Sequence, residues 1–442
     1  MMDRGAWFDR HVNLLRVISL VIILAVVAIS SSRMIRRHYS HGDFGVYVHA
    51  ARLMVAGRNI YTTPTRPVAE GGLFYIYPPL LAFLLVPLTW IPADVSIVLW
   101  TVLSVALVGW VVKAFYELVA NARFSTLTTR NRWVIVFFPV LLTSRFILQH
   151  LDRGQANILE LAILVAGFRL ADRGRPWLGG GAIGLSVAIK LIGLPVLIWY
   201  CMQRSGRVLL GAAVGLAAGL LAPALLIGLR ANAFLLRFWL STCVIGGMRN
   251  GSIMPGLAYN YSPLAQLYRF FSPAVAFRRH GHPYSLMIFQ LPMPWIHVVD
   301  WAVRLALAAA IAAYWLRFRN CSKDAFNGGY AIICVLLPLL FPTAQKNYFV
   351  FLLPGYIYAV YVWHFLGLQD RWFRGFSTAS FMLASMTTPG LWGKFLGDVF
   401  DASGCILFGA ILLAAAVFRG ADCLCKEAPS TSRNHAAALP GS

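Results

Sequence analysis

Residues 95–117 read VSIVLWTVLSVALVGWVVKAFYE, an apolar run with a single lysine before its final glutamate. A helix needs about 20 apolar residues to cross the hydrocarbon core of a bilayer. The whole chain is 59% hydrophobic and 12% charged, whereas roughly a quarter of the residues in a soluble domain are charged. We therefore expect an all-α, polytopic membrane protein. Its candidate spans are 14–32, 95–117, 133–149, 156–171, 208–228, 297–317, 328–342, 348–367, 376–391 and 403–419.

Two stretches do not fit a single span. Residues 78–92 are short and rich in proline, and residues 178–203 are long, with Lys190 near their middle. The clusters of Lys and Arg fall on one side of the membrane if the first stretch is a re-entrant or short helix and the second is a hairpin of two short helices. This arrangement predicts about twelve crossings, within a range of roughly ten to thirteen. It places both termini in the cytoplasm and the loops 33–94 and 229–296 outside.

The domain organisation follows from these spans. Residues 1–422 are expected to form one integral membrane domain with interfacial helices in its outer loops, and residues 423–442 a disordered cytoplasmic tail. The net charge of +22 comes from short basic clusters between apolar runs, which indicates contact with membrane lipids and not with nucleic acid.

Motifs for cofactors and metals are missing from the sequence. It contains no P-loop, GxGxxG, HExxH or D-x-D pattern, so we expect neither a cofactor nor a bound metal. The cysteines show no zinc spacing, and we interpret all of them as packing residues. They are Cys201, Cys243, Cys321, Cys334, Cys405, Cys423 and Cys425.

Asp43 stands out among the 16 Asp and Glu residues. It follows the first span, in HGDFGVYVHAARLMVAGRNIY (41–61). Residues 44–56 show the apolar spacing of an interfacial helix that would start close to Asp43. Asp43 is therefore either the N-cap of that helix or a functional carboxylate, and both roles can coexist.

Further polar residues lie at the ends of spans or within them. In HLDRGQAN (150–157), Asp152 pairs with Arg153 or faces a site, while Gln155 and Asn157 lie at a depth where polar groups need partners. Lys190 lies inside an apolar run, where it binds a lipid phosphate, pairs with Glu160 or snorkels to the interface.

The remaining candidates lie in the outer segments. Tyr47, Tyr61 and Tyr77 suit either an interfacial aromatic belt or a sugar-binding groove. Gln345, Lys346 and Asn347 cluster at an outer span end, where the lysine binds phosphate or snorkels. The loop 229–296 adds Arg249 and Asn260.

These residues form a recognisable pattern. Asp43 is followed by Ala51, Gly57 and Tyr61, then by FYIYPPL (74–80) and PLTWIP (87–92). Later the chain carries G-Q-x-N at 154–157 and G-x-x-x-G-L-x-x-A-I-K at 180–190. This combination resembles glycosyltransferase family 87, integral membrane enzymes of the GT-C type that use polyprenyl-phosphate-linked sugars.

The resemblance implies transfer of mannose or arabinose to a glycolipid or envelope-glycan acceptor on the outer face of the cytoplasmic membrane. It implies that Asp43 is the general base and that no metal takes part. The donor phosphate would contact Lys190, Lys346 and Arg249. The sugar and acceptor groove would include Tyr47, Tyr61, Tyr77, Asp152, Gln155, Asn157, Asn260, Gln345 and Asn347.

Two segments depart from the family pattern. AQKNY (344–348) has no histidine where the family usually has W-x-H-H or W-x-H-Y, and Asn260-Tyr261-Ser262 stands where it has N-Q-S. A flippase for lipids or lipid-linked sugars is the alternative, because it would use the same cationic groove without needing Asp43.

Overall fold

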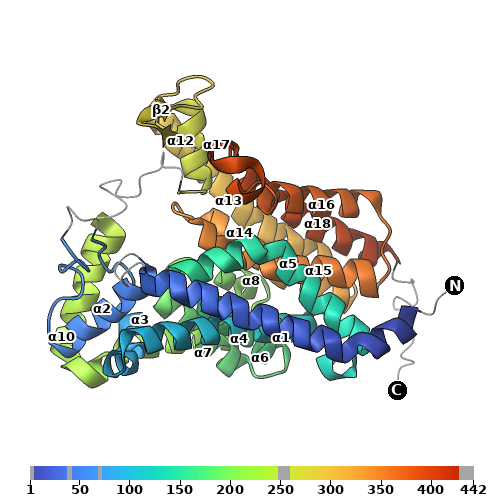
Figure 1. The fold of residues 1–442 in the computed structure, drawn as a ribbon, viewed down its shortest axis with the longest axis horizontal. Coiled ribbons are helices and arrows are strands. Elements are labelled where there is room, and N and C mark those ends of the chain that lie inside the picture. Colours follow the sequence, from blue (N-terminus) through green and yellow to red (C-terminus); the bar gives the residue numbers. More distant parts are fainter. Residues whose placement is uncertain (1–3, 37–41, 68–71, 247–258, 428–442) are drawn as a thin grey trace, which may run out of the picture.

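The computed structural model describes residues 4–36, 42–67, 72–246 and 259–427, and nearly all of its regular structure is helical. Helix α1 (Arg4–Arg36) runs along the bundle toward the end where α2 (Asp43–Val55), α3 (Pro79–Leu84) and α10 (Ala224–Phe238) lie (Figure 1). Among the described residues, 8 helices are long and apolar enough to cross a membrane, by length and composition. The all-α, multi-pass fold is confirmed, while the figure of about twelve crossings stays a prediction.

Each run predicted as a span is mostly helical, but 208–228, 348–367 and 376–391 each extend over more than one helical element. The two strands form an antiparallel hairpin in which Phe277 faces Tyr284. The other elements are η2 (Val86–Trp90), α4 (Ala93–Val119), η3 (Phe124–Thr126), α5 (Thr129–Arg153), α6 (Asn157–Asp172), α7 (Pro176–Ile189), η4 (Leu191–Gly193), α8 (Val196–Met202), α9 (Gly206–Leu221), η5 (Trp239–Gly246), α12 (Pro263–Phe271), β1 (Phe277–Arg279), β2 (His282–Tyr284), α13 (Met293–Phe318), α14 (Lys323–Leu340), η6 (Lys346–Leu352), α15 (Leu353–Val360), η7 (Tyr361–Phe365), α16 (Arg371–Ala384), α17 (Pro389–Ala402) and α18 (Cys405–Glu427).

Both predicted interruptions are present. The stretch 78–92 forms the short helices α3 and η2. In 178–203, helix α7 ends before Lys190, whose backbone is extended at φ −156° and ψ 132°, and the chain continues through η4 into α8. Proline and glycine after the lysine prevent one continuous helix. The break therefore places a lysine side chain within the bundle.

The first part of the predicted outer loop 229–296 is helical, and its place outside the membrane stays a prediction. The helical path that starts at Ala224 continues through α10 and η5 to Gly246, and it is itself apolar enough to be a candidate span. Arg230 and Arg237 interrupt the apolar pattern here, but both are exposed and do not end the helix. The helical path is interrupted at 222–223, before α10, and again at Gly228, where φ is 80° and ψ is 159°, directly before the predicted start of the loop.

Helix α2 confirms the predicted helix but not its interfacial position. Phe44, Tyr47, Val48 and Ala51 are all buried, so its faces are covered by other parts of the bundle. A helix lying along the membrane would keep one face in the polar headgroup layer. Because α2 packs against α3 and η2, its first residue is held within the fold.

The C-terminal end also differs from expectation. Helix α18 extends to Glu427, so residues 423–427 are helical, and the rest of the predicted disordered tail lies outside the described residues. Cys321 and Cys425 form a disulfide and are not simple packing residues. Their Cα atoms are 5.2 Å apart, so the turn before α14 lies against the last turn of α18.

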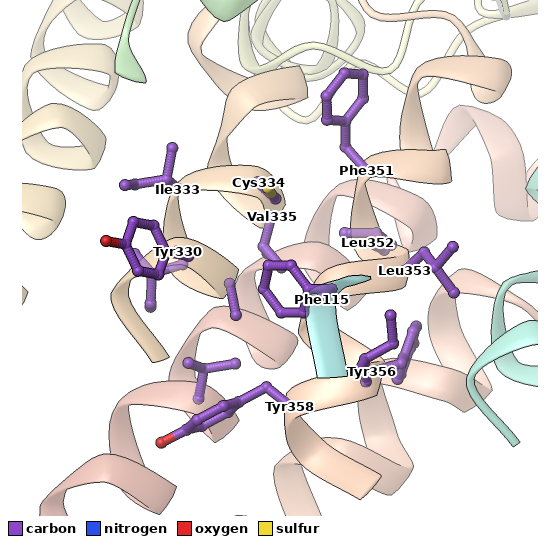
Figure 2. Close-up of a cluster of buried hydrophobic side chains, with 14 of the residues drawn as sticks. Phe115, Tyr330, Ile333, Cys334, Val335, Phe351, Leu352, Leu353, Tyr356 and Tyr358 are labelled. Atoms are coloured by element: carbon purple, nitrogen blue, oxygen red, sulfur yellow. The ribbon is translucent and has the colours of Figure 1, made fainter. Parts of the chain in front are cut away.

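The largest buried cluster lies between α4, α14 and α15. Figure 2 shows Phe115 of α4 beside Val335 of α14 and Leu352 of η6. Lipid tails are as apolar as these side chains, so close van der Waals packing holds such helices together in a membrane. This core supports η6, which carries the late polar residues.

Small residues bring α7 and α9 into close contact. A Cβ atom on Gly184 would lie 2.0 Å from the carbonyl oxygen of Ala212, and one on Gly180 would lie 2.1 Å from that of Val208. Helices in membranes use such small residues to let their backbones approach. Helix α7 leads directly to Lys190, so this contact positions the lysine.

We expect Gly184→Ala to separate α7 from α9 and to destabilise the protein by about 1–3 kcal/mol, the scale of overpacking. Gly181→Ala is the matched control, because its new Cβ would meet nothing closer than 4.0 Å. Melting temperatures of the two purified variants in the same detergent test this expectation. Equal melting temperatures would contradict the close contact.

Candidate active site

Asp43 is the first residue of α2, at the end of the bundle that α1 reaches. Gly42 occupies the N-cap position and makes no side-chain cap, so the predicted N-cap role of Asp43 is wrong. The adjacent Phe44 stacks on Trp100 of α4, with ring centroids 5.3 Å apart. Such a pair contributes about 1 kcal/mol beyond burial. It fixes the start of α2 while the Asp43 residue remains partly exposed.

The turn between α5 and α6 meets α2 at Gly154. This glycine has φ +64°, and a Cβ atom on it would lie 2.6 Å from the Cβ of Phe44. The indole Nε1 of Trp100 donates a hydrogen bond to the Gly154 carbonyl at 3.1 Å. Only glycine accepts both this backbone conformation and this approach without strain. The turn therefore sets the next residue, Gln155, against α2.

Gln155 connects the turn to the surroundings of Asp43. Its Oε1 accepts a hydrogen bond from Tyr47 Oη at 2.8 Å, and its side chain is buried. Burial raises the pKa of the Asp43 carboxyl, while the Gln155 amide and the charges of Arg153 and Lys190 act in the opposite direction. A raised pKa makes a carboxylate a stronger base near neutral pH.

Lys190 lies on the other side of this turn and is 7% exposed. Its Nζ donates a hydrogen bond to Asn157 Oδ1 at 2.6 Å. The same Nζ lies 3.8 Å from the ring centroid of Tyr348 and 5.0 Å from that of Tyr77. No salt bridge joins it to Glu160, another described residue, so that predicted pair is wrong. An amide and two ring faces hold its charge without neutralising it.

Gln345 and Asn347, at the start of η6, join the same set of contacts. Asn157 Nδ2 donates to Asn347 Oδ1 at 3.4 Å, and Asn347 Nδ2 donates to Gln345 Oε1 at 3.4 Å. On the other side, Tyr77 meets Tyr47 edge to face, with centroids 5.5 Å apart. The residues that we call the polar cluster are Asp43, Tyr47, Tyr77, Gln155, Asn157, Lys190, Gln345 and Asn347.

Lys346 lies outside the polar cluster. Its Nζ forms an ion pair with Asp401 of α17, and Asp401 also accepts a hydrogen bond from Arg145 of α5 at 2.7 Å. The Nζ atom lies 5.5 Å from the ring centroid of Tyr261. Lys346 therefore shares a carboxylate with a second cation, in contrast to the predicted direct contact with phosphate.

Two predicted groove residues bind the backbone next to members of the polar cluster. Tyr61 Oη donates to the carbonyl of Tyr77 at 3.0 Å, and its ring stacks on Phe238. Asn260 Oδ1 accepts the backbone N–H groups of Ser262 and Ala344, each at 3.0 Å. Asn260 thus fixes the chain just before Gln345 and has no other side-chain contact with the polar cluster among the described residues.

Asp152 and Arg249 have different outcomes. Asp152 forms its salt bridge with Arg33 of α1 at 2.9 Å and not with Arg153, so the predicted pair of neighbours is wrong. Asp152 lies near the end of α5, outside the polar cluster. Arg249 lies outside the described residues.

Three further residues near the candidate site were not predicted from the sequence. His150 is fully buried, and neither ring nitrogen has a hydrogen-bond partner in the described structure. Tyr348 covers Lys190, and Arg145 binds Asp401. His150 lies in the same HLDRGQAN segment as Gln155, so its polarity beside an apolar run was the available signal. Tyr348 and Arg145 gave no signal of their own.

Comparisons with known proteins match this region. A polyprenol-phosphate-mannose-dependent alpha-(1-2)-phosphatidylinositol mannoside mannosyltransferase of Mycobacterium tuberculosis is 27% identical over 188 residues, 40% of this chain and 44% of that protein. A protein of the same name from Mycolicibacterium smegmatis is 25% identical over 183 residues, 39% of this chain and 40% of that protein. This chain spans less than half the length of these relatives.

The family comparison covers more of the chain. The sequence profile described as glycosyltransferase family 87 matches residues 75–343, which is more than half of the 442 residues. Tyr77, Gln155, Asn157 and Lys190 lie within the match, whereas Asp43 precedes it. The resemblance found in the sequence is thereby confirmed, and the chain belongs to glycosyltransferase family 87.

Proposed function

We propose that this protein transfers a sugar from a polyprenyl-phosphate donor to a glycolipid or envelope-glycan acceptor, with Asp43 as the general base. The observation that carries the proposal is the polar cluster, in which Gln155 and Asn157 place the carboxylate of Asp43 and the ammonium of Lys190 on either side of one turn. The reaction needs a base for the acceptor and a cation for the leaving group, and both are available here.

Asp43 and Lys190 together account for the proton and the negative charge that the proposed reaction releases. The acceptor hydroxyl oxygen forms a bond to the anomeric carbon, and the bond from that carbon to the phosphate oxygen breaks. The polyprenyl phosphate leaves with the bonding electrons, and Lys190 compensates its negative charge. The hydroxyl proton passes to Asp43. We assign this charge compensation to Lys190 because its ammonium is buried and held beside Asn157.

Mannose is the sugar that the comparisons favour over arabinose. Both curated relatives are named for a polyprenol-phosphate-mannose donor and a phosphatidylinositol mannoside acceptor. Their aligned parts cover less than half of each relative, and the late loop of this chain has AQKNY in place of the family's histidine pattern. We therefore propose mannose as the first donor sugar to test and a glycolipid as the first acceptor.

Asp43→Asn should lower kcat by about 100-fold or more, the usual contribution of a general base. The change keeps the size of the side chain but removes the proton acceptor. Membranes with equal amounts of wild-type and variant protein would be assayed for mannose transfer from polyprenyl phosphate mannose. In the wild type, kcat/KM should rise as the pH increases through the pKa of Asp43. Burial raises this pKa above the ordinary aspartate value.

Asp94→Asn is the matched control, because Asp94 is an exposed carboxylate in the first turn of α4. It should retain wild-type turnover. If Asp43→Asn also retains it, Asp43 is not the base. A wild-type chain that moves lipid-linked sugar across vesicle membranes without transferring it would favour the flippase instead.

Lys190 and Lys346 should respond differently to removal of their charge. Lys190→Met should raise the KM for the donor by about tenfold or more, because a charge-assisted contact to phosphate is lost. Lys346→Met should mainly lower the melting temperature, because it takes one of two cations away from the buried Asp401. Donor KM values and melting temperatures of both variants test this, and the reverse pattern would exchange the two roles.

We infer the orientation from the loop charges. The basic clusters around 123–132, 173–175, 204–207, 317–323 and 371–374 fall on one side if both termini are cytoplasmic. The polar cluster then faces outward, as the proposed envelope acceptor requires. The Cys321–Cys425 disulfide lies at the predicted cytoplasmic end, where cells normally keep thiols reduced.

We therefore expect Cys321 and Cys425 to be free thiols in growing cells and to bond once membranes are isolated in air. Rapid acid quenching, alkylation with a mass-tagged maleimide and gel electrophoresis would measure the pair. A reporter fused after the C-terminus would give its side of the membrane. An oxidised pair in quenched cells together with an external reporter would reverse the proposed orientation.

A further inference from the structure

A second polar feature lies beside the polar cluster. It is an open groove of about 490 Å³ between the C-terminal half of α5 and residues 385–388, which connect α16 to α17. From α5 the groove is lined by Ser144, Arg145, Leu148, Gln149, Asp152 and Arg153. They form three adjacent pairs that repeat every four residues, which places them on one face of the helix. The hydroxyl, amide and carboxylate groups along this face suit the hydroxyls of a sugar.

The surroundings of the groove carry an excess of positive charge. Arg145 and Lys346 share the single carboxylate of Asp401, and Asp152 is paired with Arg33. Arg153 is exposed and forms no salt bridge with any described residue. Counting Arg153 and these partners gives four cations against two carboxylates. An arginine guanidinium with free donors binds phosphate oxygens in a bidentate manner.

One residue of the groove lining, Arg153, is linked to the region of Asp43. The charge of Arg153 acts on the Asp43 carboxylate. The backbone carbonyl oxygen of Arg153 lies 3.0 Å from the point where a Cβ atom on Gly42 would stand. The charge of Lys190 acts on the same carboxylate, and its Nζ is held by Asn157 at 2.6 Å. Two cations in different settings therefore act on Asp43, an exposed one that lines the groove and a buried one within the polar cluster.

We propose that this groove binds the acceptor and that Arg153 recognises a phosphodiester next to the acceptor's sugar. The inference rests on the proposed function and deepens it, because it divides the site into a donor side at Lys190 and an acceptor side at Arg153. The acceptor is then an anionic glycolipid, and a neutral glycan binds less tightly. The sugar lies along α5, with its attacking hydroxyl at Asp43.

The test measures equilibrium binding to the full chain in lipid nanodiscs. The probes are a lipid-linked mannoside with a phosphodiester, an uncharged alkyl mannoside with the same sugar, and polyprenyl phosphate. The wild type should prefer the phosphodiester mannoside. Arg153→Gln should reduce this preference by at least about tenfold, the loss expected for one charge-assisted contact. Arg153→Lys should retain part of it, because the charge remains without the bidentate geometry.

Arg58→Gln is the matched control, because Arg58 is an exposed arginine just beyond α2 that does not line the groove. It should leave the preference between the two mannosides unchanged. If Arg153→Gln weakens polyprenyl phosphate binding and not the mannoside preference, the groove belongs to the donor and the inference is wrong. An unchanged preference in Arg153→Gln overturns it as well.

The binding test is independent of turnover. A wild-type chain that binds the phosphodiester mannoside selectively, and loses the selectivity in Arg153→Gln, supports the groove even if no sugar is transferred. That result would contradict the proposed function alone. Transfer to both mannosides with no difference in binding would support the function and contradict the groove.

Discussion

The close approach of the turn at Gly154 to the start of α2 determines the geometry of the whole site. A side chain at Gly154 would collide with Phe44, whose ring lies on Trp100, whose indole in turn binds the Gly154 carbonyl. The three residues form a closed set of contacts, so α2 cannot shift without breaking one of them. Because Asp43 immediately precedes Phe44, the set also fixes the carboxylate. A motif that looked like a simple turn in the sequence is thus the support of the proposed base.

The residues after Gly154 extend this support in two directions. Gln155 binds Tyr47 on α2, and Asn157 binds both Lys190 after α7 and Asn347 in the late loop. Polar groups in an apolar bundle are costly unless they have partners, so each of these contacts stabilises the others. Four segments that are distant in the chain therefore meet at G-Q-x-N. One short turn therefore supplies three contacts: Gly154 packs closely on Phe44, Gln155 connects to α2 beside Asp43, and Asn157 binds Lys190.

What the sequence could predict depended on how local each signal was. The spans followed from apolar runs, and the break at Lys190 followed from a lysine with Gly193 and Pro195 close behind it. The polar cluster was largely predictable, since polar residues at span ends need partners. The burial of α2 was not, because amphipathic spacing is the same for a helix on a membrane and a helix under another element. Ion pairs were missed because Arg33 and Asp152 are 119 residues apart, and Lys346 and Asp401 are 55 apart.

The shared carboxylate of Asp401 explains how Lys346 can matter without touching a substrate. One carboxylate cannot neutralise both Arg145 and Lys346, so the pair of cations retains a net positive charge beside the groove. In a medium of low dielectric constant, that charge acts over a longer distance than it would in water. Asp401 also holds α17 to α5 and η6, while Arg145 donates hydrogen bonds to the Ala384 carbonyl and to Thr387 Oγ1 beside the far wall of the groove. The same three residues thereby stabilise the fold and set the potential that an anionic substrate would meet on its way to Asp43.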